Sequence, residues 1–439
     1  MKRLIEFDLM QWKLNENRKP LLVNGIRQVG KTFIIKEFGN TQFEDMIYIN
    51  FDLEPMLCDV FKRTKDPKKI LQDLSIYSEK RIDSQKTLIF FDEIQSCNEA
   101  LNSLKYFDEA VESYYIIGAG SYLGITLAKG ESFPVGKVEL IELLPMTFCE
   151  FLLAQKQDAL VDYIETIAVD QHLSVPIFEK VKDFYREYYI VGGMPEAVKT
   201  WVQTKDVEAL EKVQTNILNA YYRDFSKYPP SQIIPRILGV WNAIVNQLSK
   251  ENRKFQYSEI DKGARAREYE SALDWLLAGG YIHKVKMINK LELPLLGYAS
   301  DTHFKIYMPD TGLLRKKAEY PASALSVVSD HSNITFKGAL AENMVFQELR
   351  HAYSGSVFYW ANTRQEIDFI IQYDRYIIPI EVKYGENIKS SSLSKLLDTF
   401  PDMIGVRYSM KNLSYDGRIL NIPIPMVSET MRLLKQIMR

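Results

Sequence analysis

The feature that most constrains this chain is the stretch Gly25–Thr32, GIRQVGKT, which fits the pattern G-x-x-x-x-G-K-[ST]. The apolar run Leu21–Val23 before it predicts a buried strand, and Phe33–Phe38 after it predicts the start of a helix. A strand, a glycine-flanked turn and a helix N-terminus together direct backbone N–H groups and the helix dipole at an anion. The stretch therefore predicts a P-loop for nucleotide phosphates, and the alternative is a chance match in a glycine turn.

Two side chains of this loop have specific expected roles. Lys31 would bind the β- and γ-phosphates, and the Thr32 hydroxyl would bind Mg²⁺. We expect ATP and Mg²⁺ as cofactors, although nothing in the loop itself excludes a guanine nucleotide. The expected nucleotide-binding residues are Gly25, Ile26, Arg27, Gln28, Val29, Gly30, Lys31, Thr32 and Phe33.

A second acidic pattern, Thr87–Glu93, resembles a Walker B strand: an apolar run followed by Asp92 and Glu93. We expect the apolar part to be buried next to the P-loop strand, with the acids at its carboxyl end, where α/β sheets bind ligands. Asp92 would then hold the Mg²⁺ shell through water, and Glu93 would polarise the attacking water. The alternative is a strand that ends in solvated acids.

Three more apolar runs, residues 46–51, 114–121 and 138–143, predict strands that alternate with helical segments. This alternation predicts an α/β fold with a parallel sheet covered on both faces. Ser121 is the last residue of one of these runs and is a candidate catalytic sensor close to the γ-phosphate. Its alternative role is the N-cap of a plain turn.

Length and composition limit the remaining possibilities. A chain of 439 residues is expected to form two to four domains. The net charge of −2 argues against bulk electrostatic coating of nucleic acid. The three cysteines lack metal spacing and predict no disulfide framework. Acidic residues near Met1 argue against a signal peptide, and no apolar run could span a bilayer. We expect a cytoplasmic protein without a membrane partner.

Residues 151–228 read as mostly helical, interrupted by the turn Gly192–Glu196. This turn could present backbone or the ring of Pro195 to the nucleotide, or it could be an ordinary corner between helices. Residues 231–318 predict three helices and a two-stranded hairpin, the arrangement of a winged helix. The candidate DNA-contacting residues there are Lys262, Arg265 and Arg267, which lie among acidic neighbours. The alternative is that this segment is a packing module.

The last predicted domain contains a second set of candidate catalytic side chains. Asp368 and the pair Glu381 and Lys383 lie on adjacent predicted strands, and residues i and i+2 of a strand share a face. They could therefore meet at one point, joined by Glu342 from a helix. Two carboxylates can hold Mg²⁺ and a lysine can activate water. The alternative is that these charges are only paired with one another.

With these stretches identified, the chain resembles prokaryotic AAA-family ATPases that carry a C-terminal domain called DUF4143. The matching stretches are Gly25–Thr32, Leu88–Glu93, Leu143–Phe148, Gly192–Glu196 and Glu366–Phe369. The resemblance implies a P-loop ATPase core, a helical lid related to signal-transduction ATPases and a C-terminal domain similar to the PD-(D/E)xK nuclease fold. Many relatives have a Gly-Arg pair before the fifth strand, whereas this chain has Gly136-Lys137, which lacks the guanidinium fork of an arginine finger.

The resemblance implies Asp368, Glu381 and Lys383, with Glu342, as the nuclease-like set. The expected domains are the ATPase core (1–150), the lid (151–230), a winged-helix-like domain (231–320), an α/β restriction-endonuclease-like domain (333–425) and a C-terminal helix (426–439). The first functional hypothesis is an ATPase that acts on DNA or RNA through the nuclease-like domain. The second is a regulatory ATPase whose last domain is an inactive module for a protein partner. The third, a scaffold without turnover, conflicts with the presence of Lys31 and Glu93. Assembly into a homo-oligomer is compatible with each.

Overall fold

A computed structural model of the chain describes residues 1–121, 136–250, 253–323, 334–384 and 391–438. The chain divides into two compact units. The N-terminal unit comprises Lys2–Leu144 and the short segment Ala278–Tyr281, and the C-terminal unit comprises Pro145–Leu277 and Ile282–Arg439. None of the helices in the described ranges is long and apolar enough to cross a membrane.

The N-terminal unit is built on a five-stranded sheet with the order β2-β3-β4-β1-β5, in which every pair of neighbours is parallel. This confirms the predicted α/β fold with a parallel sheet. The strands are β1 (Leu21–Asn24), β2 (Asp45–Asn50), β3 (Thr87–Asp92), β4 (Tyr115–Gly120) and β5 (Glu139–Glu142).

The order of these strands corrects one prediction. We expected the strand that ends in Asp92 to lie next to the P-loop strand, but β4 lies between β1 and β3. The hydrophobic pattern identifies buried strands but contains no information about which neighbours they choose. That choice depends on where each helical crossover returns the chain to the sheet.

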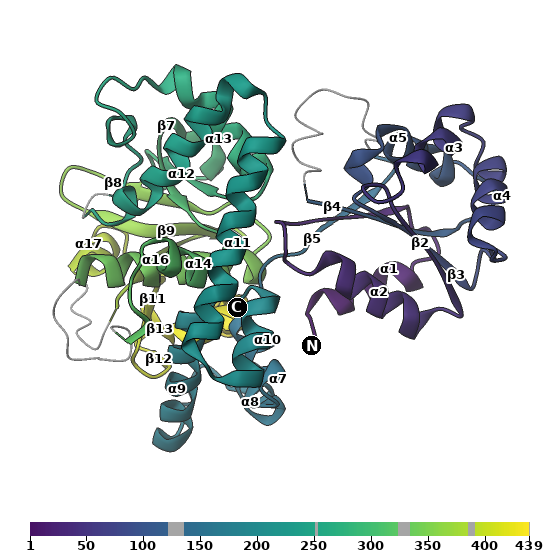
Figure 1. The fold of residues 1–439 in the computed structure, drawn as a ribbon. Coiled ribbons are helices and arrows are strands. Elements are labelled where there is room, and N and C mark those ends of the chain that lie inside the picture. The colour runs from purple at the N-terminus through teal and green to yellow at the C-terminus, as the bar shows by residue number, and fades with distance from the viewer. Residues whose placement is uncertain (122–135, 251–252, 324–333, 385–390, 439) are drawn as a thin grey trace. The chain divides into compact units, whose positions relative to one another are not determined.

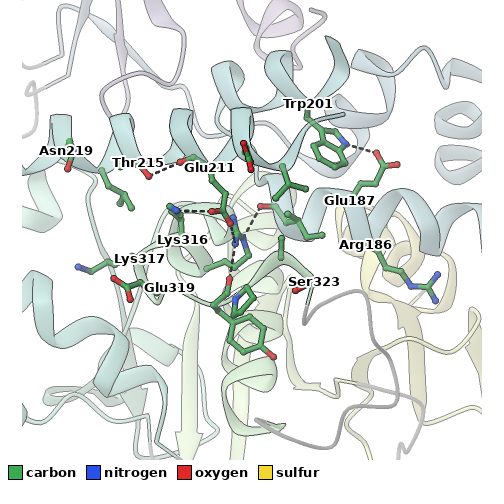
Figure 2. Close-up of a pocket in the computed structure, with 18 of the residues that line it drawn as sticks. Arg186, Glu187, Trp201, Glu211, Thr215, Asn219, Lys316, Lys317, Glu319 and Ser323 are labelled. Carbon is green, nitrogen blue, oxygen red and sulfur yellow. Dashed lines mark hydrogen bonds and ion pairs between the residues drawn. The ribbon is translucent and has the colours of Figure 1, made fainter. Parts of the chain in front are cut away.

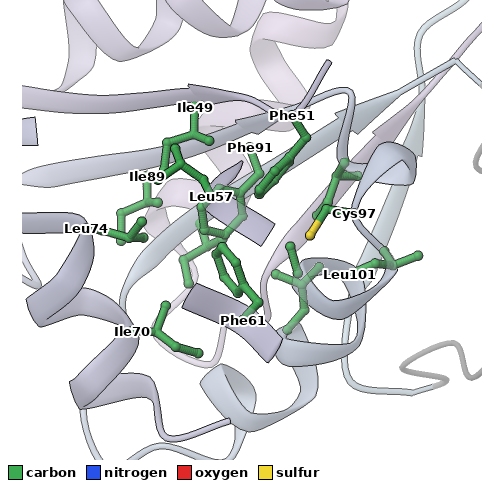
Figure 3. Packing of buried hydrophobic residues seen from close by; sticks show 14 of the residues in the cluster. Ile49, Phe51, Leu57, Phe61, Ile70, Leu74, Ile89, Phe91, Cys97 and Leu101 are labelled. Carbon is green, nitrogen blue, oxygen red and sulfur yellow. The ribbon is translucent and has the colours of Figure 1, made fainter. Parts of the chain in front are cut away.

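Helices cover both faces of this sheet (Figure 1). Helices α1 and α2 lie on one face, and α3, α4 and α5 lie on the other. Their bounds are α1 (Ile5–Leu14), α2 (Lys31–Gln42), α3 (Cys58–Arg63), α4 (Pro67–Ser78) and α5 (Asn98–Asp108). Figure 3 shows the core between the sheet and α3–α5, where Ile49, Phe51, Ile89 and Phe91 pack against Phe61.

Two cysteines meet in this core, which corrects another expectation. The sequence predicted no disulfide framework, whereas the structure pairs Cys58 with Cys97, with their Cα atoms 5.8 Å apart. The two residues are 39 positions apart in the chain and become neighbours because α3 and α5 pack against the same face of the sheet. The third cysteine, Cys149, is buried and free.

The C-terminal unit contains an eight-stranded mixed sheet with the order β12-β13-β11-β10-β9-β8-β6-β7. Its strands are β6 (His283–Ile288), β7 (Ala299–Tyr307), β8 (Phe358–Ala361), β9 (Glu366–Tyr373), β10 (Tyr376–Val382), β11 (Gly405–Ser409), β12 (Ser414–Tyr415) and β13 (Ile419–Pro423). Because β6 pairs in parallel with β8, the predicted hairpin of residues 281–307 extends the same sheet as the strands of the last predicted domain. The winged-helix assignment itself stays a prediction.

The C-terminal unit also contains eleven α-helices among its described residues. They are α7 (Phe148–Ala154), α8 (Asp158–Thr166), α9 (Val175–Val191), α10 (Pro195–Thr204), α11 (Val207–Lys227), α12 (Ile234–Leu248), α13 (Ala266–Ala278), α14 (Thr311–Lys317), α16 (Ile334–Ala352), α17 (Ser391–Thr399) and α18 (Thr430–Ile437). One apolar cluster packs Leu393, Leu396 and Leu397 of α17 against Ile367 of β9 and Ile288 of β6. The hairpin and the C-terminal strands therefore share a core.

Candidate functional site

The predicted P-loop forms the turn between β1 and α2, as the sequence indicated. Gly30 has the left-handed conformation (φ +98°), which glycine adopts without steric cost. Gly25 lies so close to the carbonyl oxygen of Leu143 that a Cβ atom there would be 2.4 Å from it. The two glycines are therefore required by the backbone path of the loop. Phe33, just after the loop, is 60% exposed.

Lys31 lies almost completely buried inside this turn. Its ammonium donates to the carbonyl of Gly25 (2.7 Å), to the carbonyl of Ile26 (3.2 Å) and to the hydroxyl of Ser121 (2.8 Å). Burial lowers the pKa of Lys31 to about 8, and the nearby carboxylates of Glu93 and Asp92 oppose that shift. The structure thus brings the candidate sensor Ser121, from the end of β4, into direct contact with the P-loop lysine.

The two candidate metal ligands also meet. The Thr32 hydroxyl donates to Oδ2 of Asp92 at 3.0 Å, although one strand separates β3 from β1. A hydroxyl and a carboxylate are hard oxygen donors, and Mg²⁺ in phosphate sites binds one or two such groups together with phosphate oxygens and water. These residues therefore fit a magnesium ion.

Glu93 occupies a strained position directly after Asp92. Its backbone is left-handed (φ +49°), which is uncommon for a residue with a side chain. The Gln95 amide donates to its Oε2 at 2.6 Å. Burial raises the pKa of Glu93, while the Gln95 hydrogen bond and the charge of Lys31 lower it. Strained backbone and a raised carboxyl pKa are both typical of functional groups, which agrees with a role as general base.

The sequence missed several neighbours of this site. The Tyr48 hydroxyl donates to Oδ2 of Asp92 at 3.0 Å, and the Asn50 amide donates to the same oxygen at 3.4 Å. The guanidinium of Arg3, almost wholly buried, donates to the carbonyl of Val29 in the P-loop at 3.2 Å. The alternation Ile47-Tyr48-Ile49-Asn50 was the available signal, because it places two polar side chains on one face of a half-buried strand. No sequence signal identifies Arg3.

The glycine turn of the C-terminal unit has a structural explanation. The N–H of Gly193 donates to Oδ2 of Asp310 at 2.5 Å, and the N–H of Met146 donates to the carbonyl of Gly193 at 2.7 Å. A Cβ atom at Gly192 would be 2.4 Å from Oδ1 of Asp310, and one at Gly193 would be 2.2 Å from the Met146 carbonyl. The backbone of this turn is therefore used in packing α9 against its neighbours. Pro195 is the first residue of α10, and its contact with a nucleotide stays a prediction.

The same buried network contains a carboxyl group whose titration can be measured. Burial raises the pKa of Glu348 to about 7, and donation from the Tyr188 hydroxyl (2.9 Å) and the Phe148 N–H (3.0 Å) opposes this shift. Glu150 lies close enough to raise it further. The folded chain binds the Glu348 proton more tightly than the unfolded chain does. Protonation therefore contributes fully to the free energy of unfolding below the pKa that Glu348 has in the unfolded chain. This contribution is lost as the pH rises to about 7.

We predict that Glu348→Gln removes this part of the pH dependence of stability. The free energy of unfolding of the wild-type chain should fall by roughly 3 kcal/mol relative to that of the variant between pH 4.5 and pH 8. Urea unfolding at several pH values, monitored by far-UV circular dichroism, measures the difference between the two chains. Parallel profiles for wild type and variant would contradict the assignment of this titration to Glu348.

The candidate nuclease-like residues of β9 and β10 lie on adjacent strands, and two of them are paired with each other. In the β9–β10 register Ile380 pairs with Phe369, so the next position places Glu381 beside Asp368. The Lys383 ammonium lies 2.7 Å from Oε1 of Glu381, and the N–H of Val382 donates to Oδ2 of Asp368 at 2.8 Å. Burial raises the pKa of Asp368, and the charge of Lys305 lowers it.

Lys305 and Arg253, which the sequence did not indicate, pair with the fourth residue of this set. The fully buried Lys305 ammonium lies 3.0 Å from Oε1 of Glu342 and 2.7 Å from Glu366. Arg253 forms an ion pair with the other carboxylate oxygen of Glu342. Among the described residues, no group of three or more His, Cys, Asp or Glu side chains could hold a metal ion.

Figure 2 shows a pocket of the C-terminal unit, a cavity of about 1050 Å³ between α9, α10, α11 and α14. Arg315 is buried in its wall, where it donates to Glu211 (3.2 Å) and to the side-chain oxygen of Gln214 (2.7 Å). Lys316 lies 3.1 Å from Glu211 as well. These contacts link α14 to α11, and they pair Arg315 and Lys316 with Glu211 in the wall of the cavity.

Three stretches of the chain match known families. Residues 17–152 match the AAA domain family AAA_14, residues 182–323 match a domain of unknown function, DUF8612, and residues 337–427 match the domain of unknown function DUF4143. No curated protein matches the chain.

Three solved structures resemble the chain distantly. The Walker-type ATPase PABY2304 of Pyrococcus abyssi is 17% identical with a TM-score of 0.43, and the match covers 74% of this chain and 96% of that one. PCH-2 of C. elegans is 12% identical (TM-score 0.27; 48% and 66% covered). Cdc6p of Pyrobaculum aerophilum is 11% identical (TM-score 0.24; 73% and 92% covered). Likenesses at this level carry no argument about activity.

The glycine turn between β1 and α2, together with the acids that end β3 of a parallel sheet, defines a P-loop ATPase of the AAA class. More specifically, the chain combines an AAA-family ATPase domain with a C-terminal DUF4143 domain. The resemblance inferred from the sequence is confirmed in both parts.

Proposed function

We propose that this chain binds ATP with Mg²⁺ at the P-loop and hydrolyses it. The observation that carries the proposal is the convergence of Lys31, Thr32, Asp92 and Ser121 through direct hydrogen bonds, with Glu93 adjacent to Asp92. The assignment of Glu93 as the general base, and of Thr32 and Asp92 as the metal-binding residues, rests on this geometry and on the chemistry of the side chains.

Each residue has one task in this proposal. Lys31 binds phosphate oxygens, and its contact with Ser121 holds it at the end of β4. Thr32 and Asp92 hold Mg²⁺, which neutralises negative charge on the phosphates when bound. Glu93 accepts a proton from the attacking water, and the Gln95 amide orients its carboxylate.

The first experiment is a phosphate-release assay on the full chain at low salt, with Mg²⁺ or EDTA and with or without DNA. We expect turnover that requires Mg²⁺. Turnover at the same rate in EDTA would overturn the metal assignment, and no turnover under any condition would overturn the hydrolytic function. Stimulation by DNA that weakens as salt rises would support coupling to nucleic acid.

Two proposals remain for the DUF4143 domain, and one observation favours the second. The first is binding and processing of DNA or RNA at Glu342, Asp368, Glu381 and Lys383. The second is a regulatory ATPase in which this domain is catalytically inactive and binds a protein partner. Lys305 and Arg253, two cations from outside the candidate set, pair with Glu342. Carboxylates already paired with internal cations are poor ligands for Mg²⁺.

We therefore predict that the wild-type chain does not cut nucleic acid. Incubation of labelled single- and double-stranded DNA and RNA with Mg²⁺ should give no more cleavage with wild type than with Glu381→Ala. Cleavage by wild type that Glu381→Ala abolishes, with ATP turnover unchanged, would contradict this prediction and support the nuclease reading.

A further inference from the structure

Apolar and polar side chains alternate along the outer strand β2, and the polar side chains face the candidate metal site. Side chains alternate along a strand, so Ile47 and Ile49 point into the apolar core, while Tyr48 and Asn50 point to the opposite face. In the parallel register Asn50 pairs with Asp92 and Tyr48 pairs with Phe90. The polar side chains of β2 thus lie beside the carboxylate that ends β3.

Asp92 is 2% exposed, and a buried carboxylate needs donors to remain charged and fixed in one orientation. Its Oδ1 accepts the N–H of Glu93 at 3.2 Å. Its Oδ2 accepts two hydroxyl groups, those of Thr32 and Tyr48, each at 3.0 Å. Thr32 belongs to the proposed metal site, so the Tyr48 hydroxyl is the closest remaining side-chain donor to this oxygen.

Contacts from three directions hold the Tyr48 phenol in place. The Lys36 ammonium lies 3.4 Å from the centre of the ring, a cation–π contact. The Asn50 amide donates to the phenol oxygen at 3.2 Å, and the Phe90 ring is 5.4 Å away, centre to centre. Lys36 is four residues after Thr32 on α2, so one helix face carries both the metal-site hydroxyl and the cation that contacts Tyr48.

We propose that Tyr48 is a positioning residue for the magnesium site, because its hydroxyl keeps the Asp92 carboxylate turned toward Thr32. This proposal rests on the proposed function of the P-loop. It assigns a role to the outer strand β2, whereas in this sheet the sequence placed candidate residues of the nucleotide site only at the ends of β1, β3 and β4. Donors behind a metal ligand fix its orientation, and their removal typically costs about 10- to 100-fold in metal affinity.

The test compares Tyr48→Phe with wild type by the binding of a fluorescent ATP analogue. The phenylalanine ring keeps the contacts with Lys36 and Phe90, so that only the hydroxyl is lost. We expect the Mg²⁺ concentration that gives half-maximal nucleotide binding to rise about 10-fold, and excess Mg²⁺ to restore binding. Nucleotide affinity in EDTA should remain within about twofold of wild type, because the hydroxyl acts through the metal site alone.

The matched control is Tyr77→Phe, which also removes one phenol–carboxylate hydrogen bond in the same unit. The Tyr77 hydroxyl lies 2.6 Å from Glu54 at an exposed position, and its loss should leave the Mg²⁺ midpoint unchanged. A Tyr48→Phe midpoint equal to wild type, or an equal loss of affinity in Mg²⁺ and EDTA, would overturn the role of Tyr48. A wild-type chain that binds nucleotide equally well with and without Mg²⁺ would instead overturn the proposed metal site, and this proposal with it.

Discussion

Lys31→Ala is expected to lower ATP turnover on the order of 100- to 1000-fold, the usual cost of removing one preorganised group from a developing charge. The Lys31 ammonium is buried in the P-loop and hydrogen-bonded to two loop carbonyls and to Ser121. Although burial lowers its pKa to about 8, the amine remains mostly protonated at neutral pH. No other P-loop side chain provides a buried cation at this point, so the loss should weaken ATP binding as well.

Phosphate release and binding of a fluorescent ATP analogue measure the two effects separately. The matched control is Lys137→Ala, because Lys137 forms surface ion pairs with Asp108 and Glu109 at 3.2 Å each. That variant should keep wild-type turnover. Full turnover by Lys31→Ala would place the nucleotide site elsewhere, and equal losses in both variants would indicate a general effect of removing a lysine.

Glu93→Gln is expected to reduce turnover by on the order of 100-fold or more while ATP binding is retained. The carboxylate is half-buried beside Asp92, and this partial burial raises its pKa, which makes it a better base at neutral pH than an exposed glutamate. Glutamine has the same shape and still accepts the hydrogen bond from Gln95, but it cannot take a proton from water. The loss should therefore appear in kcat with little change in KM.

Steady-state kinetics and nucleotide binding in Mg²⁺ test this separation. Glu44→Gln serves as the control, because Glu44 forms an exposed ion pair with Lys86 at 2.9 Å and should not affect either quantity. If Glu93→Gln lost nucleotide binding in proportion to turnover, Glu93 would be part of the binding site and the general base would have to be another group.

The outcomes of the two variants also separate the two halves of the site. Lys31 acts on the phosphates before and during reaction, so its loss affects binding and turnover together. Glu93 acts on water, so its loss affects turnover alone. If the Lys31 and Glu93 substitutions changed nucleotide binding and turnover in the same way, the roles assigned to these two residues would be wrong.

Much of the ATPase domain could be predicted because its signals are local. Gly25–Thr32 is continuous in sequence, and its flanking apolar runs form β1 and α2 as expected. Asp92 is the last residue of the buried strand β3, and Glu93 follows it directly. In each case the residues that define the site are neighbours in the chain, so spacing alone identifies them.

The groups that support these residues could not be predicted in the same way. Arg3, Tyr48 and Asn50 reach the P-loop or Asp92 from other elements, and their contacts depend on which strands become neighbours. The order β2-β3-β4-β1-β5 puts β2 beside β3, and hydrophobic periodicity does not contain that information. The pairing of Cys58 with Cys97 arises for the same reason, from two helices on one face of the sheet.

The sequence by itself determined the P-loop with its lysine and threonine, and the two acids at the end of β3. It also determined that Asp368 and Glu381 lie near each other. Each of these features depends on spacing within one element or two adjacent elements. Only the tertiary structure decided what those acids face. In the ATPase domain Asp92 meets hydroxyl and amide donors, whereas in the DUF4143 domain Glu342 meets two cations, the buried Lys305 and the partly buried Arg253. The physical reason is that a carboxylate's chemistry depends on the charges that folding places around it, and those charges come from distant parts of the chain.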